Sequence, residues 1–283
     1  MIVRVTLHDR CGSVWAVNRL SGSELIVVIS DGSAVPAGTD LNPVLSGHAR
    51  WLKSLGFDSA TAQLNPDALD APAGALSVVR AEVSIVYLVH TRADRAEQIR
   101  QALEDAGHAV VTDNDLRAVV TAARVLTELR RTGHPINQSA VVVADTDELF
   151  QMAPLLIAIG IRNLVLWKQA DATALPLARI AQDADIVVDL RAVPVDAPRT
   201  PGQTSPLVVR LPALADCLAV LPGLLAAMVN TRTARLPIDV LAAVTQMLAT
   251  TTAPGSALAT PDPTLTDGIA WAARQALRHP RSG

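Results

Sequence analysis

The sequence predicts an α/β fold built on parallel sheets. Short runs of β-branched residues, typical of buried strands, alternate along the chain with segments whose apolar residues recur at helical spacing. Aromatic residues make up only 2% of the 283 residues, so the hydrophobic half of the chain is mostly Ala, Val, Leu and Ile. These residues fill sheets that helices cover on both faces, and such sheets are parallel with right-handed crossovers.

The first part of the chain predicts a β-α-β unit preceded by a strand and a helix. The predicted strands are residues 25–30, 83–89 and 108–112, and the predicted helices are residues 43–55 and 92–106. Gly107 follows the second helix at the position where a left-handed residue ends many helices. Residues 71–75 are rich in Pro, Gly and Ala and are expected to interrupt regular structure.

The second part predicts another β-α-β unit followed by helices. Its predicted strands are residues 140–144, 164–167 and 186–190, and its predicted helices are residues 116–131, 148–159, 175–182, 214–229, 238–248 and 265–277. Residues 193–206 hold four prolines and are expected to form a surface loop.

Several classes of protein are excluded by charge and composition. Residues 211–229 are apolar enough to raise the question of a membrane span, but they contain Asp216 and a Pro222-Gly223 break. A charge near the middle of a span costs about 2.5 to 3.5 kcal/mol, so a buried core helix and no membrane are expected. The net charge is −3 with scattered arginines, which argues against a nucleic-acid partner.

Cysteine usage and the start of the chain indicate a cytoplasmic protein. Cys11 and Cys217 are far apart and have no His or Cys at ligand spacing, so both are expected to stay free thiols. The first ten residues show no apolar stretch of the kind found in export signals.

The turn after residues 140–144 is where a dinucleotide would bind in a Rossmann domain. That site needs glycines, so that backbone N–H groups at a helix N-terminus can approach the pyrophosphate. The residues here are Asp145-Thr146-Asp147-Glu148, and their carboxylates favour a helix dipole but repel phosphate. Lys168 stands where an acidic residue would bind the ribose. No bound cofactor is therefore expected.

Five segments, in the same order along the chain, resemble motifs of bacterial malic enzymes. Residues 27–35 (VVISDGSAV) resemble V-V-T-D-G-T-A-V; residues 47–53 (GHARWLK) resemble G-K-A-x-L-F-K; residues 112–120 (TDNDLRAVV) resemble D-D-Q-H-G-T-A-I-V; residues 218–225 (LAVLPGLL) resemble N-V-L-A-F-P-G-I-F, with Thr231-Arg232 after them; and residues 261–263 (PDP) resemble the C-terminal segment. The resemblance covers roughly residues 24–278.

The resemblance implies a malic-enzyme-like α/β domain at residues 1–115, a reduced Rossmann-like domain at residues 116–210, and C-terminal helices at residues 211–283. The last segment is expected to pack back on the N-terminal domain.

Malic enzymes decarboxylate malate oxidatively with NAD(P) and a divalent metal, and the resemblance implies that most residues for this chemistry are missing. The general-base lysine falls on His48, and the catalytic tyrosine has no counterpart, since the only tyrosine is Tyr87 in a strand. Of three metal-binding carboxylates only Asp113 remains, whereas Mg²⁺ and Mn²⁺ need several oxygens. The substrate-binding asparagines fall on Asp216 and Cys217.

Each remaining polar residue also has a structural interpretation. His48 could act as a base only with an orienting partner, and otherwise is a histidine on a helix surface. Lys53 fits a surface lysine, and Asp113 and Asp115 fit an N-cap before a helix at residue 116, or the wall of a cleft. Asp216 is expected to face a cleft or to pair with an arginine, because an unpaired buried carboxylate is costly. Cys217 fits a small core residue.

Three hypotheses about function follow. The first is a catalytically inactive malic-enzyme-like protein, a binding or regulatory subunit that forms a homo-oligomer or a hetero-oligomer with an active malic enzyme paralogue. The alternative is an NAD(P)-dependent malate oxidoreductase with an atypical cofactor site, with His48 as base and Asp113 and Asp115 as a reduced Mg²⁺ or Mn²⁺ site. The second alternative is a sensor of a small metabolite, bound in an interdomain cleft.

Overall fold

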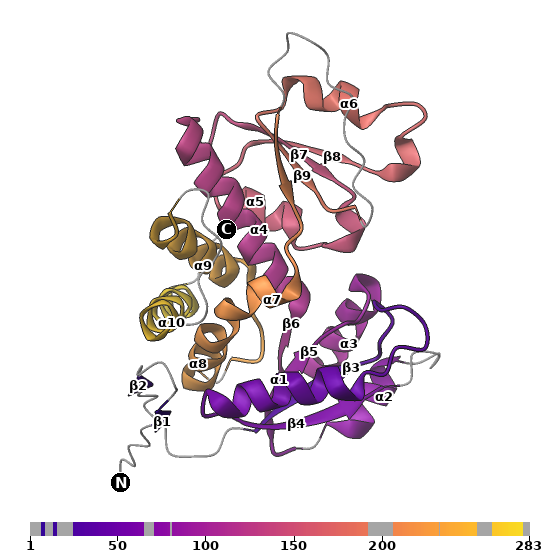
Figure 1. Ribbon diagram of the computed structural model, residues 1–283, viewed down its shortest axis with the longest axis vertical. Helices are drawn as coiled ribbons and strands as arrows, with labels where there is room; N and C mark the ends of the chain where they lie inside the picture. Colours follow the sequence, from indigo (N-terminus) through magenta and orange to yellow (C-terminus); the bar gives the residue numbers. More distant parts are fainter. Residues whose placement is uncertain are drawn as a thin grey trace. The chain divides into compact units, whose positions relative to one another are not determined.

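The structure is a computed structural model of the chain. It describes residues 25–64, 71–79, 81–191, 206–231, 233–253 and 262–279, together with the backbone of two short strands, β1 (Leu7–His8) and β2 (Val14–Trp15), which pair antiparallel. Figure 1 shows the elements in chain order.

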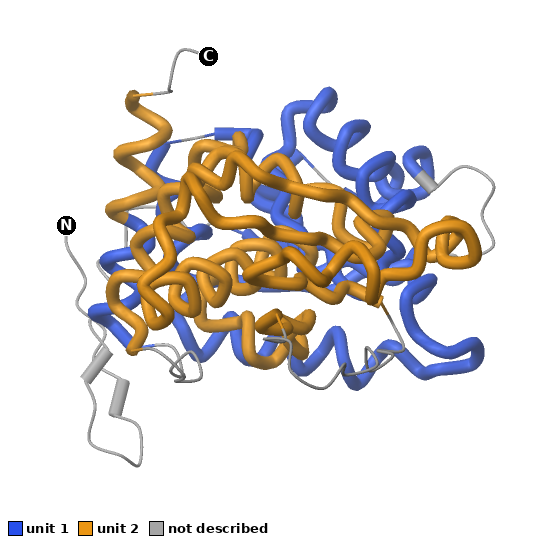
Figure 2. Tube along the Cα trace, turned by 90° about the horizontal axis from the view of Figure 1, so that it is seen from above, with its two compact units in different colours: residues 1–113, 222–236, 261–270 blue, residues 114–221, 237–260, 271–283 orange. Residues whose placement is uncertain are grey.

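The chain divides into two compact units, coloured separately in Figure 2. Unit 1 contains residues 1–113, 222–236 and 261–270, and unit 2 contains residues 114–221, 237–260 and 271–283. The C-terminal helices, which we expected to pack as a group on the N-terminal domain, are shared between the two units.

Unit 1 is built on a parallel sheet of four strands. They are β3 (Leu25–Ser30), β4 (Asp58–Gln63), β5 (Val83–Leu88) and β6 (Ala109–Thr112), in the spatial order β4-β3-β5-β6. After β3 the chain forms β4 on one side of β3, and then forms β5 on the opposite side of β3. The strand order therefore reverses between β3 and β5, which makes this position a topological switch point.

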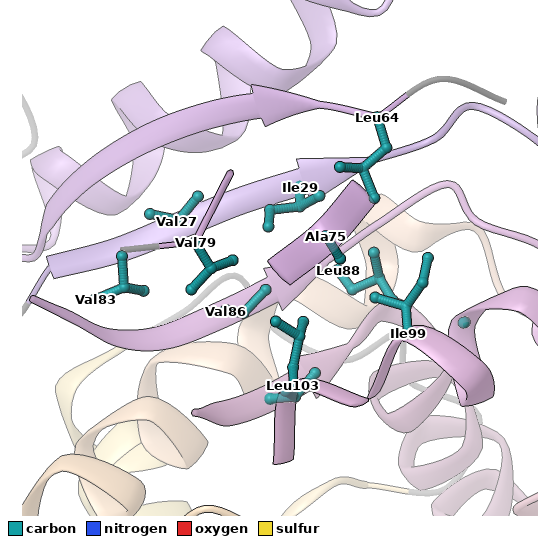
Figure 3. Packing of buried hydrophobic residues seen from close by; sticks show 12 residues of the cluster. Val27, Ile29, Leu64, Ala75, Val79, Val83, Val86, Leu88, Ile99 and Leu103 are labelled. Carbon is teal, nitrogen blue, oxygen red and sulfur yellow. The ribbon is translucent and has the colours of Figure 1, made fainter. Parts of the chain in front are cut away.

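Helices cover both faces of this sheet because successive strand residues point to opposite faces. The face that carries Val27, Ile29 and Val86 packs against α2 (Ala71–Val78) and α3 (Ala93–Asp105), as the close view in Figure 3 shows. Helix α1 (Asn42–Ser54) contacts β3 and β4 and buries three of its residues, Leu45, Ala49 and Leu52. Unit 1 thus has its own apolar core.

Unit 2 is built on a second parallel sheet of four strands. They are β7 (Ala140–Ala144), β8 (Asn163–Trp167), β9 (Ile186–Asp189) and β10 (Leu207–Arg210), in the spatial order β10-β9-β7-β8. The strand order reverses between β7 and β9, so unit 2 has a switch point of its own. A core cluster that includes Val142, Trp167 and Val187 packs against the segment of α6 (Leu177–Ile180).

The remaining helices complete the chain. They are α4 (Asp113–Thr132), α5 (Met152–Ala158), α7 (Leu214–Cys217), α8 (Leu221–Thr231), α9 (Ile238–Thr251) and α10 (Pro263–Arg278), with short 3₁₀ turns that include Thr146–Glu148 and Leu218–Val220. The predicted fold class, two parallel α/β sheets with surrounding helices, is confirmed.

Two predicted elements need correction here, and two strands were not predicted. Residues 71–75 begin α2 rather than interrupting the chain, because Pro72 lies in the first turn, where no N–H is required. The predicted helix at residues 214–229 is two helices joined by a 3₁₀ turn. Strands β4 and β10 were not predicted: β4 has mostly exposed, weakly apolar residues, and β10 is four residues long.

One described stretch, Leu214–Thr231, is long and apolar enough to cross a membrane by length and composition, with a mean hydropathy of 1.6. Slightly more than half of it, 56%, is buried inside the protein. It therefore fits the predicted core helix at least as well as a span.

Candidate functional site

The two switch points are the candidate sites, because ligands of open parallel sheets bind where strand order reverses, beyond the carboxyl ends of the strands. The first switch point consists of the residues that follow β3 and β5, and the second of those that follow β7 and β9. The described residues with positive φ other than glycine are His90 (52°), which follows β5, and Asp145 (69°), which follows β7. Such backbone strain is common at functional sites.

At the first switch point, a buried carboxylate binds the turn after β3 to helix α3. Asp31 is fully buried, and its Oδ2 lies 2.6 Å from Nε of Arg95. Its Oδ1 accepts hydrogen bonds from the backbone N–H and hydroxyl of Ser33, at 2.9 and 2.8 Å. The Ser33 hydroxyl oxygen in turn accepts the N–H of Arg92 at 2.9 Å. The carboxylate is thus already neutralised by residues of the chain.

A second carboxylate, that of Asp113, holds the strained backbone after β5. The N–H of His90 donates to Oδ2 of Asp113 at 3.0 Å, and the carbonyl of His90 accepts the N–H of Ala34 at 3.2 Å. The predicted N-cap role of Asp113 and Asp115 is wrong, because α4 begins at Asp113 itself. Aspartate is favoured in the first turn of a helix, where it stabilises the helix dipole, as well as at the N-cap. The sequence therefore does not show which of these two positions Asp113 and Asp115 occupy.

His48 lies on α1 among other rings. Its ring centroid is 5.7 Å from that of Tyr87, in an edge-on arrangement, and 5.9 Å from that of His90. Burial, and secondly the charge of His90, lower the pKa of His48 from 6.5 to about 4. An imidazole whose pKa is lowered in this way accepts a proton weakly near neutral pH, so the burial of His48 disfavours it as the base of the enzyme hypothesis.

The metal site of the enzyme hypothesis does not fit the residues present, and Tyr87 does not replace the missing catalytic tyrosine. Tyr87 is fully buried in β5, where its hydroxyl does not reach a solvent-facing substrate. Asp113 and Asp115 are two residues apart on α4, so their side chains point about 200° apart around the helix. In the described part of the chain, no three His, Cys, Asp or Glu side chains come together in a way that could hold a metal ion.

At the second switch point, the described turn after β7 does not form a phosphate cradle. β7 ends at Ala144, and Asp145 follows in the left-handed conformation, its N–H donating to the carbonyl of Trp167 at 2.8 Å. Thr146–Glu148 then form a 3₁₀ turn, with the side chains of Asp147 and Glu148 exposed. A dinucleotide pyrophosphate would meet carboxylates here rather than a row of amide groups.

The predicted helix at residues 148–159 begins later than expected. Helix α5 starts at Met152, and the predicted favourable interaction of Asp145, Asp147 and Glu148 with its dipole is therefore wrong. Pro154 explains the shift, because proline is tolerated in the first turn of a helix but not in its interior. The helix N-terminus is consequently displaced along the chain from the end of β7.

Two ion pairs order this edge of the sheet of unit 2. Lys168, after β8, bonds both carboxylate oxygens of Asp147 at 2.9 and 3.1 Å, and this hydrogen bond raises the pKa of Lys168. Asp189, at the end of β9, binds Arg191 through two hydrogen bonds of 2.7 and 2.8 Å. The guanidinium of Arg191 also lies 5.8 Å from the ring centroid of Trp167.

The other predicted site residues lie apart from these clusters. Lys53 is exposed in the last turn of α1, as its surface interpretation predicts. Asp115 is fully buried and accepts a hydrogen bond from Gln151 at 3.3 Å. Asp216 is exposed, so the assumption that it is buried, on which its expected cleft position or arginine partner rested, is wrong. Cys217 is buried and donates to the carbonyl of Ala213, which confirms its assignment to the core.

Two ion pairs were not predicted from the sequence. They are the buried pair of Asp31 with Arg95 and the bidentate pair of Asp189 with Arg191. In each case an aspartate ends a run of β-branched residues, which is a signal for the carboxyl edge of a sheet. The arginine partners carry no comparable signal, and Arg95 is 64 positions from Asp31 in the sequence.

No protein-family model and no curated protein matches this chain. Solved structures of malic enzymes do match it. The NAD-dependent malic enzyme of Thermotoga maritima is 17% identical, with a TM-score of 0.73 over 89% of this chain and 84% of that one. The malic enzymes of Pyrococcus horikoshii and Entamoeba histolytica are 15% and 16% identical, with TM-scores of 0.71 and 0.70, over 90% of this chain and 77% and 70% of theirs.

These likenesses show the fold. The chain is folded like a malic enzyme, which confirms the fold that the collinear motifs implied. Fold alone does not carry an activity, so function is argued from the two switch points.

Proposed function

We propose that this chain is a non-catalytic protein with a malic-enzyme fold, which acts in the cytoplasm as a binding or regulatory subunit and does not oxidise malate. The observation that carries the proposal is the second switch point. There Asp145, Asp147 and Glu148 replace the glycines on which a dinucleotide depends, and α5 begins only at Met152.

The carboxylates at the first switch point also support the proposal. The carboxylate of Asp31 is neutralised by Arg95, and that of Asp113 accepts a backbone N–H. Neither carboxylate has a companion that would complete a metal site in the described residues. Hydride transfer needs a bound dinucleotide and decarboxylation of malate needs a metal, and the residues present fit neither requirement.

An assay of the purified full chain tests the loss of malate oxidation. Malate, Mn²⁺ and either NAD or NADP are supplied, and reduction of the nucleotide is followed spectrophotometrically, beside thermal melts with each nucleotide. We expect no turnover and no saturable rise in melting temperature. Turnover, or saturable stabilisation by a dinucleotide, would support the malate oxidoreductase alternative instead.

The subunit role has its own test. The protein is purified from its native source by a tag at its chromosomal locus, and the preparation is assayed for malate oxidation and for its mass in solution. A homo-oligomer, or a hetero-oligomer with an active malic enzyme, is expected. A monomer without malate-oxidising activity would contradict the subunit role while leaving the loss of catalysis intact.

A further inference from the structure

A cavity of about 430 Å³ lies between α9 and α10, and the residues that line it all belong to unit 2 (Figure 1). On α9 the lining runs along one helix face from Asp239 to Thr250, and on α10 it runs from Trp271 to His279. At a rise of about 1.5 Å per residue, it extends over about 16 Å of α9 and about 12 Å of α10. The cavity is therefore elongated, and its volume is in the range of sites that bind small molecules.

Small side chains create this cavity. Ala243 of α9 and Ala272 and Ala276 of α10 line it, at positions where packed helices usually interlock larger side chains. Met247 and Trp271 also line the cavity, and the Trp271 side chain is 61% exposed. The alanines leave room for a ligand, while Met247 and Trp271 supply apolar surface that the ligand would cover.

One carboxylate lines the cavity. Asp239 lies in the first turn of α9 and is partly buried, and its side chain has no hydrogen bond or ion pair within the described part of the chain. No lysine or arginine is among the described lining residues, and the other ionisable one is His279. A partly buried carboxylate without a cation beside it favours a positively charged ligand.

The other polar groups of the wall also suit a cation. The side-chain amides of Gln246 and Gln275 line the cavity, and neither makes a hydrogen bond to another described residue. An ammonium group donates hydrogen bonds, and amide and carboxylate oxygens accept them. The face of the Trp271 indole attracts cations as well. Charge, hydrogen bonding and the aromatic ring therefore select the same class of ligand.

Asp239 also has a role that needs no ligand. An acidic residue in the first turn of a helix stabilises the helix dipole, and Asp239 has this position in α9. This role does not account for the hollow between the two helices or for the exposed indole of Trp271. Binding measurements separate the two roles, because the dipole interaction is the same with and without a ligand.

We propose that the cavity between α9 and α10 binds a small, elongated organic cation, whose apolar part lies against Trp271 and Met247 and whose ammonium group lies at Asp239. The inference goes beyond the proposed function and does not rest on it. The cavity is built from residues of unit 2 and shares none of them with either switch point.

Calorimetric titration of the full chain at neutral pH tests the proposal with three probes of similar size. They are phenylbutylammonium, which is a cation, phenylbutanol, which is neutral, and phenylbutyrate, which is an anion. We expect saturable binding of phenylbutylammonium and at least tenfold weaker binding of phenylbutanol, because the alcohol lacks the charge that pairs with Asp239. Phenylbutyrate should not bind measurably, because its carboxylate is repelled by that of Asp239.

Substitutions identify the residues responsible. Asp239→Asn should weaken binding of phenylbutylammonium about tenfold and leave that of phenylbutanol unchanged. Asp183→Asn removes an exposed carboxylate of unit 2 outside the cavity, so it is the matched control and should change neither affinity. Ala276→Leu fills the cavity and should abolish binding of both probes, and Trp271→Leu should weaken both. Circular dichroism and thermal melts show whether each variant is folded.

Several results would overturn the proposal. They are the absence of saturable binding of phenylbutylammonium, equal effects of Asp239→Asn and Asp183→Asn on its affinity, and undiminished binding to folded Ala276→Leu. Tighter binding of phenylbutyrate than of phenylbutylammonium would also overturn it and would assign the cavity to an anion instead.

The indole N–H signals of the unmodified chain provide a test by NMR. The signal of Trp271 is identified by its loss in Trp271→Phe, and it is expected to shift on addition of phenylbutylammonium. The signal of Trp167 is the internal reference, because its Nε1–H donates to the carbonyl of Leu175 at 2.7 Å and should not respond. A Trp271 signal that responds to protein concentration and not to phenylbutylammonium would contradict a ligand site and indicate contact between copies of the chain.

Discussion

Nε of Arg95 lies 2.6 Å from Oδ2 of Asp31, and this ion pair connects the end of β3 to helix α3 across 64 positions of sequence. Asp31 is inaccessible to water and the Arg95 side chain is 18% exposed. The pair therefore occupies the first switch point as a structural link within unit 1.

Removal of the arginine should destabilise the protein strongly. Arg95→Met leaves a buried carboxylate without its partner, so the free energy of unfolding is expected to fall by about 3 kcal/mol. Urea unfolding at neutral pH measures this change. Arg92→Met is the matched control, because Arg92 pairs with Asp94 at the surface and should change the same quantity by about 0 to 1 kcal/mol. Equal effects of the two substitutions would contradict the buried role of Arg95.

Two helical glycines should respond oppositely to alanine. A Cβ on Gly223 would lie 2.5 Å from Cβ of Ile269 and 2.8 Å from the carbonyl oxygen of Thr266, so α8 and α10 could not keep their separation. We expect Gly223→Ala to cost about 1 to 3 kcal/mol in the free energy of unfolding.

Gly47 is the control for that experiment. It lies inside α1, and a Cβ there would meet nothing within 4 Å. Gly47→Ala should therefore raise the free energy of unfolding by about 0.5 to 1 kcal/mol, through the better helix propensity of alanine. Thermal melts of both variants give the comparison, and destabilisation by both would show that α1 is more tightly packed than the structure indicates.

Acid should weaken the fold through His48. Its pKa is 6.5 in an unfolded chain and about 4 in the folded one, so the unfolded state binds more protons between these values. The free energy of unfolding should rise between pH 4 and 6.5, with a contribution from His48 of about 2 kcal/mol after allowance for its partial exposure to water.

Substitution and titration both check this prediction. His48→Gln should flatten the pH dependence of unfolding in that window, and the imidazole of His48 should titrate near pH 4 by NMR. His90→Asn, which removes the neighbouring charge and keeps a residue suited to positive φ, should raise the pKa of His48. An imidazole that titrates near 6.5 in the unmodified protein would disprove the burial of His48.

The left-handed conformation of Asp145 predicts an order of stability among its variants. Asp145→Gly adopts a φ of 69° without strain, whereas Asp145→Ala does not, so the glycine variant should be more stable than the alanine variant by about 1 kcal/mol. Thermal unfolding gives the order. Neither variant should bind NAD, because Asp147, Glu148 and the late start of α5 remain.

The sequence predicted the central strands of both sheets well. Residues 25–30 and 140–144 are runs of β-branched side chains that are buried on both faces, and burial of this kind leaves a clear signal. β4 was missed because Asp58–Gln63 is an exposed edge strand whose residues have little strand propensity. Edge strands are held by pairing with a neighbour, which local sequence does not record.

The sequence predicted which residues the candidate site lacks better than it predicted the backbone geometry and contacts of the residues present. The missing glycines at residues 145–148 are visible in the sequence, but the left-handed Asp145 and the effect of Pro154 on α5 depend on backbone geometry. His48 was correctly placed on a helix, while its proximity to His90 arises from the packing of α1 against the sheet. Contacts between distant residues explain most of what could not be predicted.

The division of the chain into interleaved segments has a consequence for how the protein is made. Unit 1 combines residues 1–113 with residues 222–236 and 261–270, which follow most of unit 2 in the sequence. A ribosome that has synthesised β3 to β6 has therefore not yet supplied the part of α10 that unit 1 requires. The part of unit 1 that is translated first becomes complete only after residues 222–236 and 261–270 have also been made.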